Sequence, residues 1–155
     1  MSRMVLSLLV ENTAGVLSRV SGLFSRRGYN IDSLSVGETE NPEYSRMTVA
    51  VSGEDGILEQ IHKQLAKLED VVEITELLPG ESVCRELVLV KVQANQKERQ
   101  SVISVADIFR AKIVDVAPES LMIELTGNQA KIDAFMRLLE GFTIKEFVRT
   151  GITGL

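Results

Sequence analysis

The chain has 155 residues, of which 45% are hydrophobic and 25% charged, a composition typical of a soluble globular protein with one ordinary domain or two small ones. No apolar run approaches the roughly 20 residues of a membrane-spanning helix, and residues 1–10 fit a buried strand better than a signal peptide. The net charge of −5, with no basic run longer than Arg26-Arg27, argues against a nucleic-acid partner. A single cysteine, Cys84, cannot form an internal disulfide, which fits a cytoplasmic location.

The first half of the chain is predicted to form, in order, a strand, a helix, two strands, a helix and a strand. Apolar residues fill both faces of residues 4–10, as in a central strand. The helix that follows ends at Arg26-Arg27, whose cations suit the helix dipole, and Gly28 can take the left-handed position after it. Asn41-Pro42 marks a turn. The other strands are predicted over residues 30–36, 46–51 and 71–77. The inward helix faces are predicted to consist of Val16, Leu17, Val20, Leu23 and Phe24, and of Ile57, Leu58, Ile61, Leu65 and Leu68.

The second half follows the same plan after Pro79-Gly80, although its residues do not repeat those of the first half. A turn at Ala117-Pro118 separates the second and third strands of this half. The predicted strands cover residues 86–92, 112–116, 121–125 and 144–148. The inward helix faces are predicted to hold Val102, Val105, Ala106 and Phe109, and Ile132, Phe135, Met136 and Leu139.

These patterns predict an α+β fold of two ferredoxin-like β-α-β-β-α-β domains in tandem, at residues 1–78 and 79–155. Right-handed crossovers would place both helices of each half on one face of an antiparallel sheet. A half of about 75 residues has a marginal core, and the other face of the sheet still carries apolar residues such as Val5 and Leu9. The second strand is an edge in this topology. We therefore expect a homodimer that pairs along this edge.

The sequence offers little for catalysis. One cysteine and one histidine, far apart, do not make a zinc site, so no metal is expected. His62 lacks an evident nucleophile or orienting partner, and nothing near Cys84 would obviously activate a thiol. No phosphate-binding glycine motif is present. No catalytic residue and no bound cofactor are therefore expected.

The turn at residues 11–17 stands out, because it joins the first strand to the first helix and contains Gly15. Asn12 or Thr13 can cap the helix, with Gly15 in its first turn. One interpretation is therefore an ordinary helix start with a permissive glycine. The alternative is a ligand site. A helix N-terminus suits a carboxylate, and the side-chain carbonyl of Asn12 can accept from an ammonium group. Together they could hold a free amino acid, with branched apolar side chains nearby selecting an aliphatic one.

Asn30-Ile31 begins the predicted edge strand just beyond Gly28. If two copies pair along that edge, Asn30 of one copy could reach the turn of the other. The ligand would then lie at a dimer interface.

The same residues carry a resemblance to a known family. The stretches 9–20 and 22–31 closely resemble the regulatory subunit of acetohydroxyacid synthase, also called acetolactate synthase. The resemblance covers nearly the whole chain and is more specific in the first half. Its other matching stretches are Ser45-Arg46-Met47-Thr48, residues 59–68 with Val71, Arg85 to Val92, Phe109-Arg110, Leu125-Thr126-Gly127, Ala134-Phe135 and Arg149-Thr150-Gly151.

The resemblance implies that the first half is an ACT domain, an amino-acid-sensing module that pairs with a second copy and binds valine at the interface. It implies a non-catalytic subunit that activates a catalytic subunit and confers feedback inhibition in valine and isoleucine biosynthesis. Thiamine diphosphate, magnesium and FAD are expected in the catalytic partner, and none of them in this chain. The implied effector residues are Asn12, Gly15, Val16 and Leu17 in the turn, and Asn30 and Ile31 in the partner strand. The second half has no glycine in the equivalent stretch Ala94-Asn95-Gln96-Lys97, so effector sites are expected only in the first half.

Three alternatives stay open. The chain could be a stand-alone ACT-type sensor that regulates another enzyme, or an interaction module without a small ligand. A small hydrolase of the acylphosphatase type shares the topology, but it needs a basic anion-binding loop where this turn is acidic and polar. The sequence does not decide among valine, leucine and isoleucine as effectors, nor which surface docks a catalytic subunit.

Overall fold

A computed structural model describes residues 2–155 and divides the chain into two compact units. The first contains the chain up to Cys84 together with Ile152–Leu155, and the second contains Arg85–Gly151. The predicted boundary after residue 78 places the whole C-terminal part in the second domain. In the structure the last four residues belong to the first unit, because they bond to its sheet.

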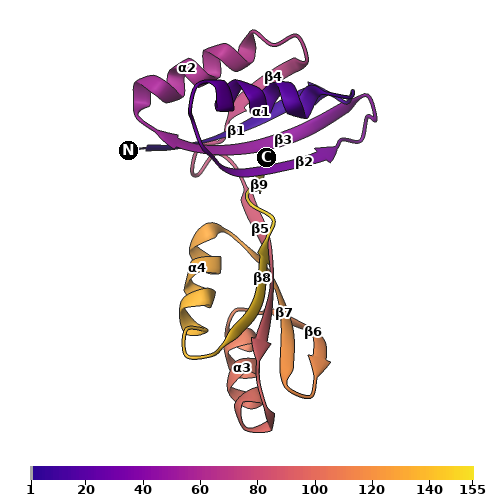
Figure 1. Ribbon diagram of the computed structural model, residues 1–155, viewed down its shortest axis with the longest axis vertical. Helices are drawn as coiled ribbons and strands as arrows, with labels where there is room; N and C mark the ends of the chain where they lie inside the picture. Colours follow the sequence, from indigo (N-terminus) through magenta and orange to yellow (C-terminus); the bar gives the residue numbers. More distant parts are fainter. Residues whose placement is uncertain (1) are drawn as a thin grey trace. The chain divides into compact units, whose positions relative to one another are not determined.

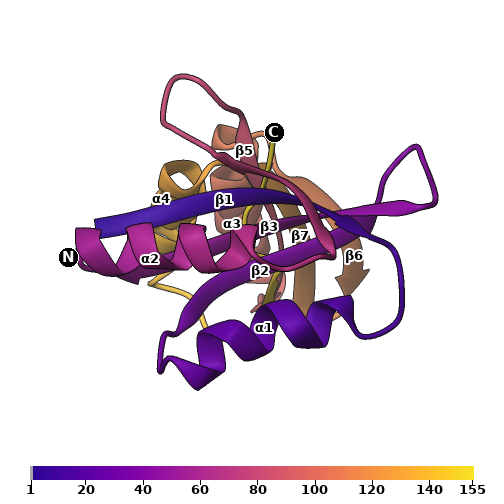
Figure 2. The ribbon, with the colours of Figure 1, turned by 90° about the horizontal axis from the view of Figure 1, so that it is seen from above.

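The first unit has the predicted β-α-β-β-α-β order and one four-stranded antiparallel sheet, with strand order β2-β3-β1-β4. Strand β2 is therefore an edge, as predicted, and β4 is the opposite edge. Figures 1 and 2 show both helices on one face of this sheet. Its elements are β1 (Ser2–Glu11), α1 (Val16–Arg26), β2 (Ile31–Glu38), β3 (Tyr44–Gly53), α2 (Asp55–Ala66) and β4 (Val71–Glu76).

Alternation along the strands builds the core of this unit. Side chains at every second position of β1 and β3 point toward the helices and are almost completely buried. The core residues are Met4, Leu6, Leu8 and Val10 of β1, Met47, Val49 and Val51 of β3, Val16, Val20, Leu23 and Phe24 of α1, and Leu58, Ile61 and Leu65 of α2.

The end of α1 is confirmed as predicted. Gly28 has φ +71°, the left-handed conformation that glycine adopts at low cost. Its N–H donates to the carbonyl of Ser25 at 3.1 Å, and the N–H of Tyr29 donates to that of Phe24 at 3.0 Å. These two bonds form a Schellman motif, which stops the helix and turns the chain toward β2.

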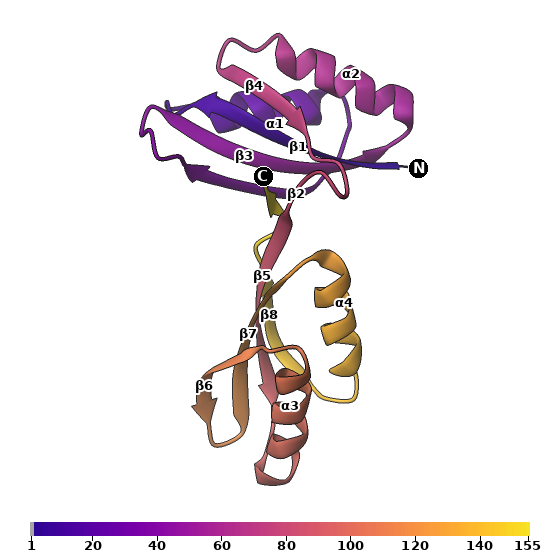
Figure 3. The ribbon, with the colours of Figure 1, turned by 180° about the vertical axis from the view of Figure 1, so that it is seen from behind.

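The second unit is a separate ferredoxin-like unit with strand order β6-β7-β5-β8. Figure 3 shows both of its helices on one face of the sheet. Phe109 and Phe135 meet edge to face in its core, with ring centroids 5.4 Å apart. Its elements are β5 (Cys84–Gln93), α3 (Gln96–Ile108), β6 (Lys112–Ala117), β7 (Ser120–Gly127), α4 (Gln129–Leu138) and β8 (Ile144–Arg149). The core residues are Val88, Val90, Val92, Ala94, Val102, Ala106, Leu121, Ile123, Leu125, Ile132, Phe135 and Leu139.

A short strand, β9 (Thr153–Gly154), has no counterpart in the predicted elements. It pairs with β5, next to the point where Val83 and Leu155 exchange two backbone hydrogen bonds of 2.9 and 3.0 Å. Figures 1 and 3 show this C-terminal end in the first unit. The C-terminal residues thus cover part of the sheet face that carries no helix.

Candidate effector-binding site

The turn after β1 differs from the prediction in its capping. Gly15 is the residue that precedes α1, with φ +89°, and it does not lie in the first turn of the helix. Neither Asn12 nor Thr13 caps α1, since no side chain accepts a hydrogen bond from the start of this helix. The helix begins at Val16, two or three residues later than a cap at Thr13 or Asn12 would place it, because Gly15 can take a left-handed conformation that strains other residues.

Asn12 instead holds the turn against the β2–β3 hairpin. Its backbone N–H donates to the carbonyl of Glu43 at 2.8 Å, and its side-chain nitrogen donates to the carbonyl of Pro42 at 3.0 Å. The side chain is exposed, and these bonds use only its nitrogen and the main chain. The side-chain oxygen of Asn12 can therefore act as an acceptor at the mouth of the turn.

The N-terminus of α1 is the least neutralised among the helices of residues 2–155. Helices α3 and α4 are capped by the side chains of Asn95 and Asn128, and α2 has Asp55 in its first turn. Helix α1 has neither a capping side chain nor an acidic residue in its first turn. Its first N–H groups therefore keep the partial positive charge that attracts a carboxylate.

A cation absent from the predicted set also lies at this turn. Arg19 is one helical turn after Gly15, and a Cβ on Gly15 would come within 2.9 Å of its Nη1 atom. The Nε of Arg19 donates to Oδ2 of Asp70 at 2.5 Å. This hydrogen bond is the main cause of the raised pKa of Arg19. The i, i+4 spacing of Gly15 and Arg19 could have indicated this contact, but Asp70 is 51 residues away and no local signal links it.

The two apolar residues predicted at the turn, Val16 and Leu17, differ in their exposure to solvent. Val16 is buried in the core at 3% exposure, so only its main chain can contact a ligand at the turn. Leu17 is 48% exposed, and its predicted place on the inward helix face is wrong, because the core-facing stripe runs through Val16, Val20 and Leu23. Leu17 remains available to a ligand or a second protein.

Asn30 and Ile31 do not lie beside the turn within one chain. Ile31 is opposite Val51, which is opposite Met4, whereas the turn follows Glu11 at the other end of β1. Seven positions along a strand, from residue 4 to residue 11, correspond to roughly 23 Å. The structure thus assembles Asn12, Gly15 and Leu17 into one location and places Asn30-Ile31 at the opposite end of the sheet.

The residues that the structure describes contain no group of side chains that points to catalysis. Within residues 2–155, no three His, Cys, Asp or Glu side chains are grouped closely enough to hold a metal ion. His62 is half-buried on α2, and Cys84 is half-buried at the start of β5. Among the helices of the same residues, none is long and apolar enough to span a membrane.

The first helix of the second unit is capped by side chains, whereas the first helix of the first unit is not. The start of α3 carries a capping box, in which Asn95 accepts from the N–H groups of Lys97 and Glu98 at 2.9 Å each, and Glu98 accepts from the N–H of Asn95. These side chains occupy the N–H groups that a carboxylate would need. The helix start in the second unit is therefore a poorer carboxylate site than the turn at Gly15.

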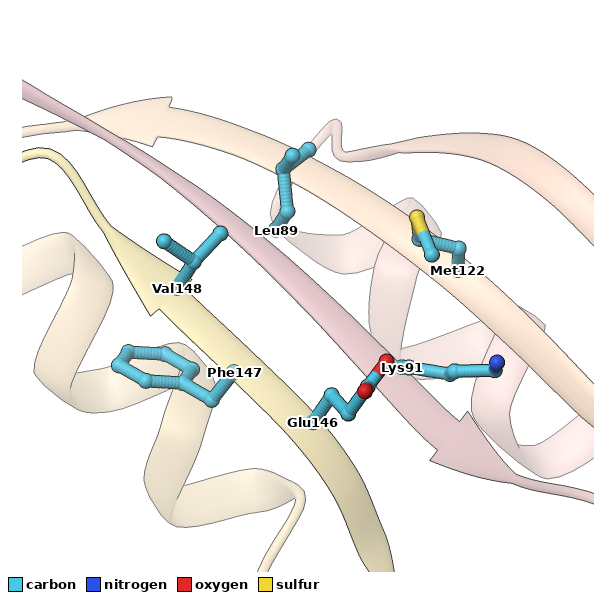
Figure 4. A pocket seen from close by; sticks show the side chains of 6 residues that line it. All are labelled: Leu89, Lys91, Met122, Glu146, Phe147 and Val148. Atoms are coloured by element: carbon cyan, nitrogen blue, oxygen red, sulfur yellow. The ribbon is translucent and has the colours of Figure 1, made fainter.

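A hollow of about 460 Å³ lies on the helix-free face of the second sheet. Figure 4 shows Leu89, Met122 and Val148 around it, with the charged side chains of Lys91 and Glu146 on neighbouring strands. These residues include no serine, threonine or cysteine, and the hollow is mainly an apolar surface with a charged margin.

Comparisons with known proteins show which family the chain resembles. A family model described as "AHAS small subunit-like ACT domain" matches residues 6–73, and one described as "Small subunit of acetolactate synthase" matches residues 85–155. Together they account for most of the chain.

Relatives and a solved structure give the same result. A probable acetolactate synthase small subunit from Methanothermobacter thermautotrophicus is 51% identical over 152 residues, covering 97% of this chain and 90% of its own. An acetolactate synthase small subunit from Mycobacterium bovis is 53% identical over 150 residues, covering 97% of this chain and 89% of its own. The crystal structure of the acetolactate synthase small subunit from Thermotoga maritima is 41% identical and superimposes with a TM-score of 0.91, over 100% of this chain and 97% of that one.

Proposed function

The chain belongs to the family of acetolactate synthase small subunits, and from this premise we propose that it is the regulatory subunit that activates the catalytic subunit and makes it sensitive to valine. It carries no active site of its own in this proposal. Thiamine diphosphate, magnesium and FAD belong to the catalytic partner. The assembly works in the cytoplasm, in branched-chain amino-acid biosynthesis.

The observation that carries the proposal is the uncapped start of α1. The carboxylate of an amino acid meets the first N–H groups of α1 next to Gly15, where no side chain caps the helix and no acidic residue lies in its first turn. The oxygen of the Asn12 side chain accepts from the ammonium group. Leu17, which is 48% exposed, offers apolar surface to an aliphatic side chain. These three contacts recognise the three parts of a branched-chain amino acid.

The strand registers support a site shared by two copies. The end of β2 at Glu38 is opposite Ser45, which is opposite Val10, so β2 ends at the same edge of the sheet as the turn. Antiparallel pairing of two β2 strands would lay the start of one strand beside the end of the other. Asn30 and Ile31 of a second copy would then lie at the end of the sheet that carries the turn, although within one chain they are roughly 23 Å away.

Valine controls activity by favouring one arrangement of the paired ACT domains over another. A ligand shifts such a balance only by its different affinity for the two arrangements, typically about 1–3 kcal/mol of coupling. Regulation therefore needs no contact between valine and the active site.

Calorimetric titration of the whole chain with L-valine tests the proposal, with L-leucine and glycine as comparisons. We expect selective, saturable binding that is lost in Asn12→Ala. The reconstituted enzyme should be activated by the chain and inhibited by valine. No selective binding, alone or with the catalytic subunit, would leave the chain as a structural activator and refute the sensing role.

A further inference from the structure

The C-terminal residues Ile152–Leu155, here called the strap, are bound to the helix-free face of the first sheet by three hydroxyl groups. The N–H of Ile152 donates to the Ser33 hydroxyl at 2.6 Å, and the Ser35 hydroxyl donates to the Ile152 carbonyl at 3.0 Å. The N–H of Gly154 donates to the hydroxyl of Thr48, which is 2% exposed, at 3.3 Å. Side-chain hydroxyls thus bond the backbone of the strap at both of these positions.

The strap also fits closely against residues 77–84, the last segment of the first unit before the chain enters the second. A Cβ added to Gly154 would lie 2.7 Å from Cδ1 of Leu77, 2.8 Å from Sγ of Cys84 and 3.2 Å from the carbonyl oxygen of Val83. One of these neighbours is main chain, which cannot move aside as a flexible side chain does. Ile152 is only 7% exposed. The strap is therefore a packed element with a glycine at its tightest point.

Two of the three hydroxyls lie on β2, the strand that begins at the candidate effector residue Ile31, directly after Asn30. The pairing of β2 with β3 shifts between Ile31 and Ser33, which leaves Asp32 in a bulge, where its carboxylate accepts from the Ser52 hydroxyl at 2.5 Å. A bulge interrupts the hydrogen-bond ladder and bends its strand. A ligand that contacts the start of β2 therefore acts on the strand segment that holds the strap.

We propose that the strap is a reversible latch that couples amino-acid binding at the start of β2 to the second unit. This inference rests on the proposed sensing function. The chain enters the second unit at Arg85 and leaves it after Gly151, so the strap is one of its two covalent connections to the first unit. Its release changes the restraint on the whole second unit. Coupling is reciprocal, so the factor by which valine changes strap docking equals the factor by which docking changes valine affinity.

The test measures strap docking in the full chain with and without saturating L-valine. Hydrogen exchange of the Ile152 and Gly154 amides reports on docking directly, and the labelling rate of the Cys84 thiol reports on the contact with Gly154. In the wild-type chain we expect valine to change the exchange of both amides by roughly fivefold or more.

Variants then break the latch without touching residues 11–17, here called the candidate effector turn. Gly154→Ala disturbs the tight contact, and the double variant Ser33→Ala, Ser35→Ala removes two hydroxyls. Both should raise strap exchange, and both should shift the valine dissociation constant in the same direction, by roughly fivefold or more. Gly56→Ala is the matched control, because nothing lies within 4 Å of an added Cβ there. It should change neither quantity.

The outcomes separate this inference from the proposed function. If valine binds and inhibits, while strap exchange is unchanged and both variants keep wild-type affinity, the latch is refuted and the sensing function stands. If the wild-type chain, alone and with the catalytic subunit, shows no valine binding, both fail together. A shift in valine affinity that accompanies strap release in both variants supports the latch.

Discussion

Arg19 and Asp70 form an ion pair directly beside the candidate effector turn, with Nε of Arg19 donating to Oδ2 of Asp70 at 2.5 Å. The pair anchors the α1 end of the turn to the segment before β4, and the N–H of Glu11 donates to the Asp70 carbonyl at 2.9 Å on the other side of the turn. Asp70 therefore fixes both ends of the turn around Gly15. This arrangement keeps a guanidinium group next to the uncapped helix start.

Replacing the guanidinium group of Arg19 should weaken valine binding. Arg19→Gln removes one positive charge near the N-terminus of α1, where a single charge changes the affinity for a carboxylate by roughly two- to fivefold. Calorimetric titration at low and high salt measures the effect, which should shrink as salt screens the charge. Arg26→Gln, in the last turn of the same helix, is the matched control and should leave valine binding unchanged. Equal effects of the two variants would argue against a role for Arg19 at the site.

Gly15→Asp should abolish valine inhibition while activation of the catalytic subunit survives. The carboxylate would compete for the first N–H groups of α1, and any side chain is strained at φ +89°. We expect the valine dissociation constant to rise at least about tenfold, or about 1.4 kcal/mol. Gly15→Ala, which adds strain without charge, should have a smaller effect.

The matched control for this prediction is Gly141→Asp, which places the same charge at an open position in the second unit. It should retain wild-type inhibition. Full valine sensitivity of Gly15→Asp in the reconstituted enzyme would show that the site lies elsewhere.

The edge strand β2 should form the interface of a homodimer. Val36 is 47% exposed on β2, so Val36→Lys should leave the fold intact but bring unpaired charge into the interface between two copies. We expect a monomer in light scattering and loss of valine binding. Val72→Lys is the control, because Val72 is 52% exposed on β4, the opposite edge of the same sheet. Dissociation by Val72→Lys alone would mean that the other edge forms the dimer.

The ion pair between Glu86 and Arg149 should stabilise the second unit. Two hydrogen bonds of 2.7 Å join the two side chains, and Glu86 is 4% exposed. The hydrogen bond to Glu86 is the main cause of the raised pKa of Arg149. Glu86→Gln should lower the free energy of unfolding by about 1–3 kcal/mol, since it weakens charge-assisted bonds in a mostly buried place.

Urea denaturation measures this loss, with Glu59→Gln as the control. Glu59 pairs with Lys63 at 3.8 Å, and both side chains are more than two-thirds exposed, at 73% and 71%. Loss of this surface pair should cost no more than about 0.5 kcal/mol. Similar losses in the two variants would contradict a stabilising role for the Glu86–Arg149 pair.

The order of strands and helices and the topology of both halves follow from local patterns in the sequence. Period-two alternation in β1 and the spacing of Val20, Leu23 and Phe24 in α1 depend on residues within one or two turns of each other. The left-handed Gly28 is likewise a local requirement, and an edge position for β2 follows from the split β-α-β topology. Such features were predictable because the interactions that decide them lie close together in the chain.

Other features depended on residues that only the folded chain brings together. The exposure of Leu17 depends on how far α1 is rotated over the sheet, and the roughly 23 Å between Ile31 and the turn depends on strand register. The bond between Arg19 and Asp70 spans 51 positions, and the bond between Ile152 and Ser33 spans 119. No periodicity encodes contacts at such separations, because they arise from the packing of whole elements. The strap and the charge at the candidate effector turn therefore became visible only in the tertiary structure.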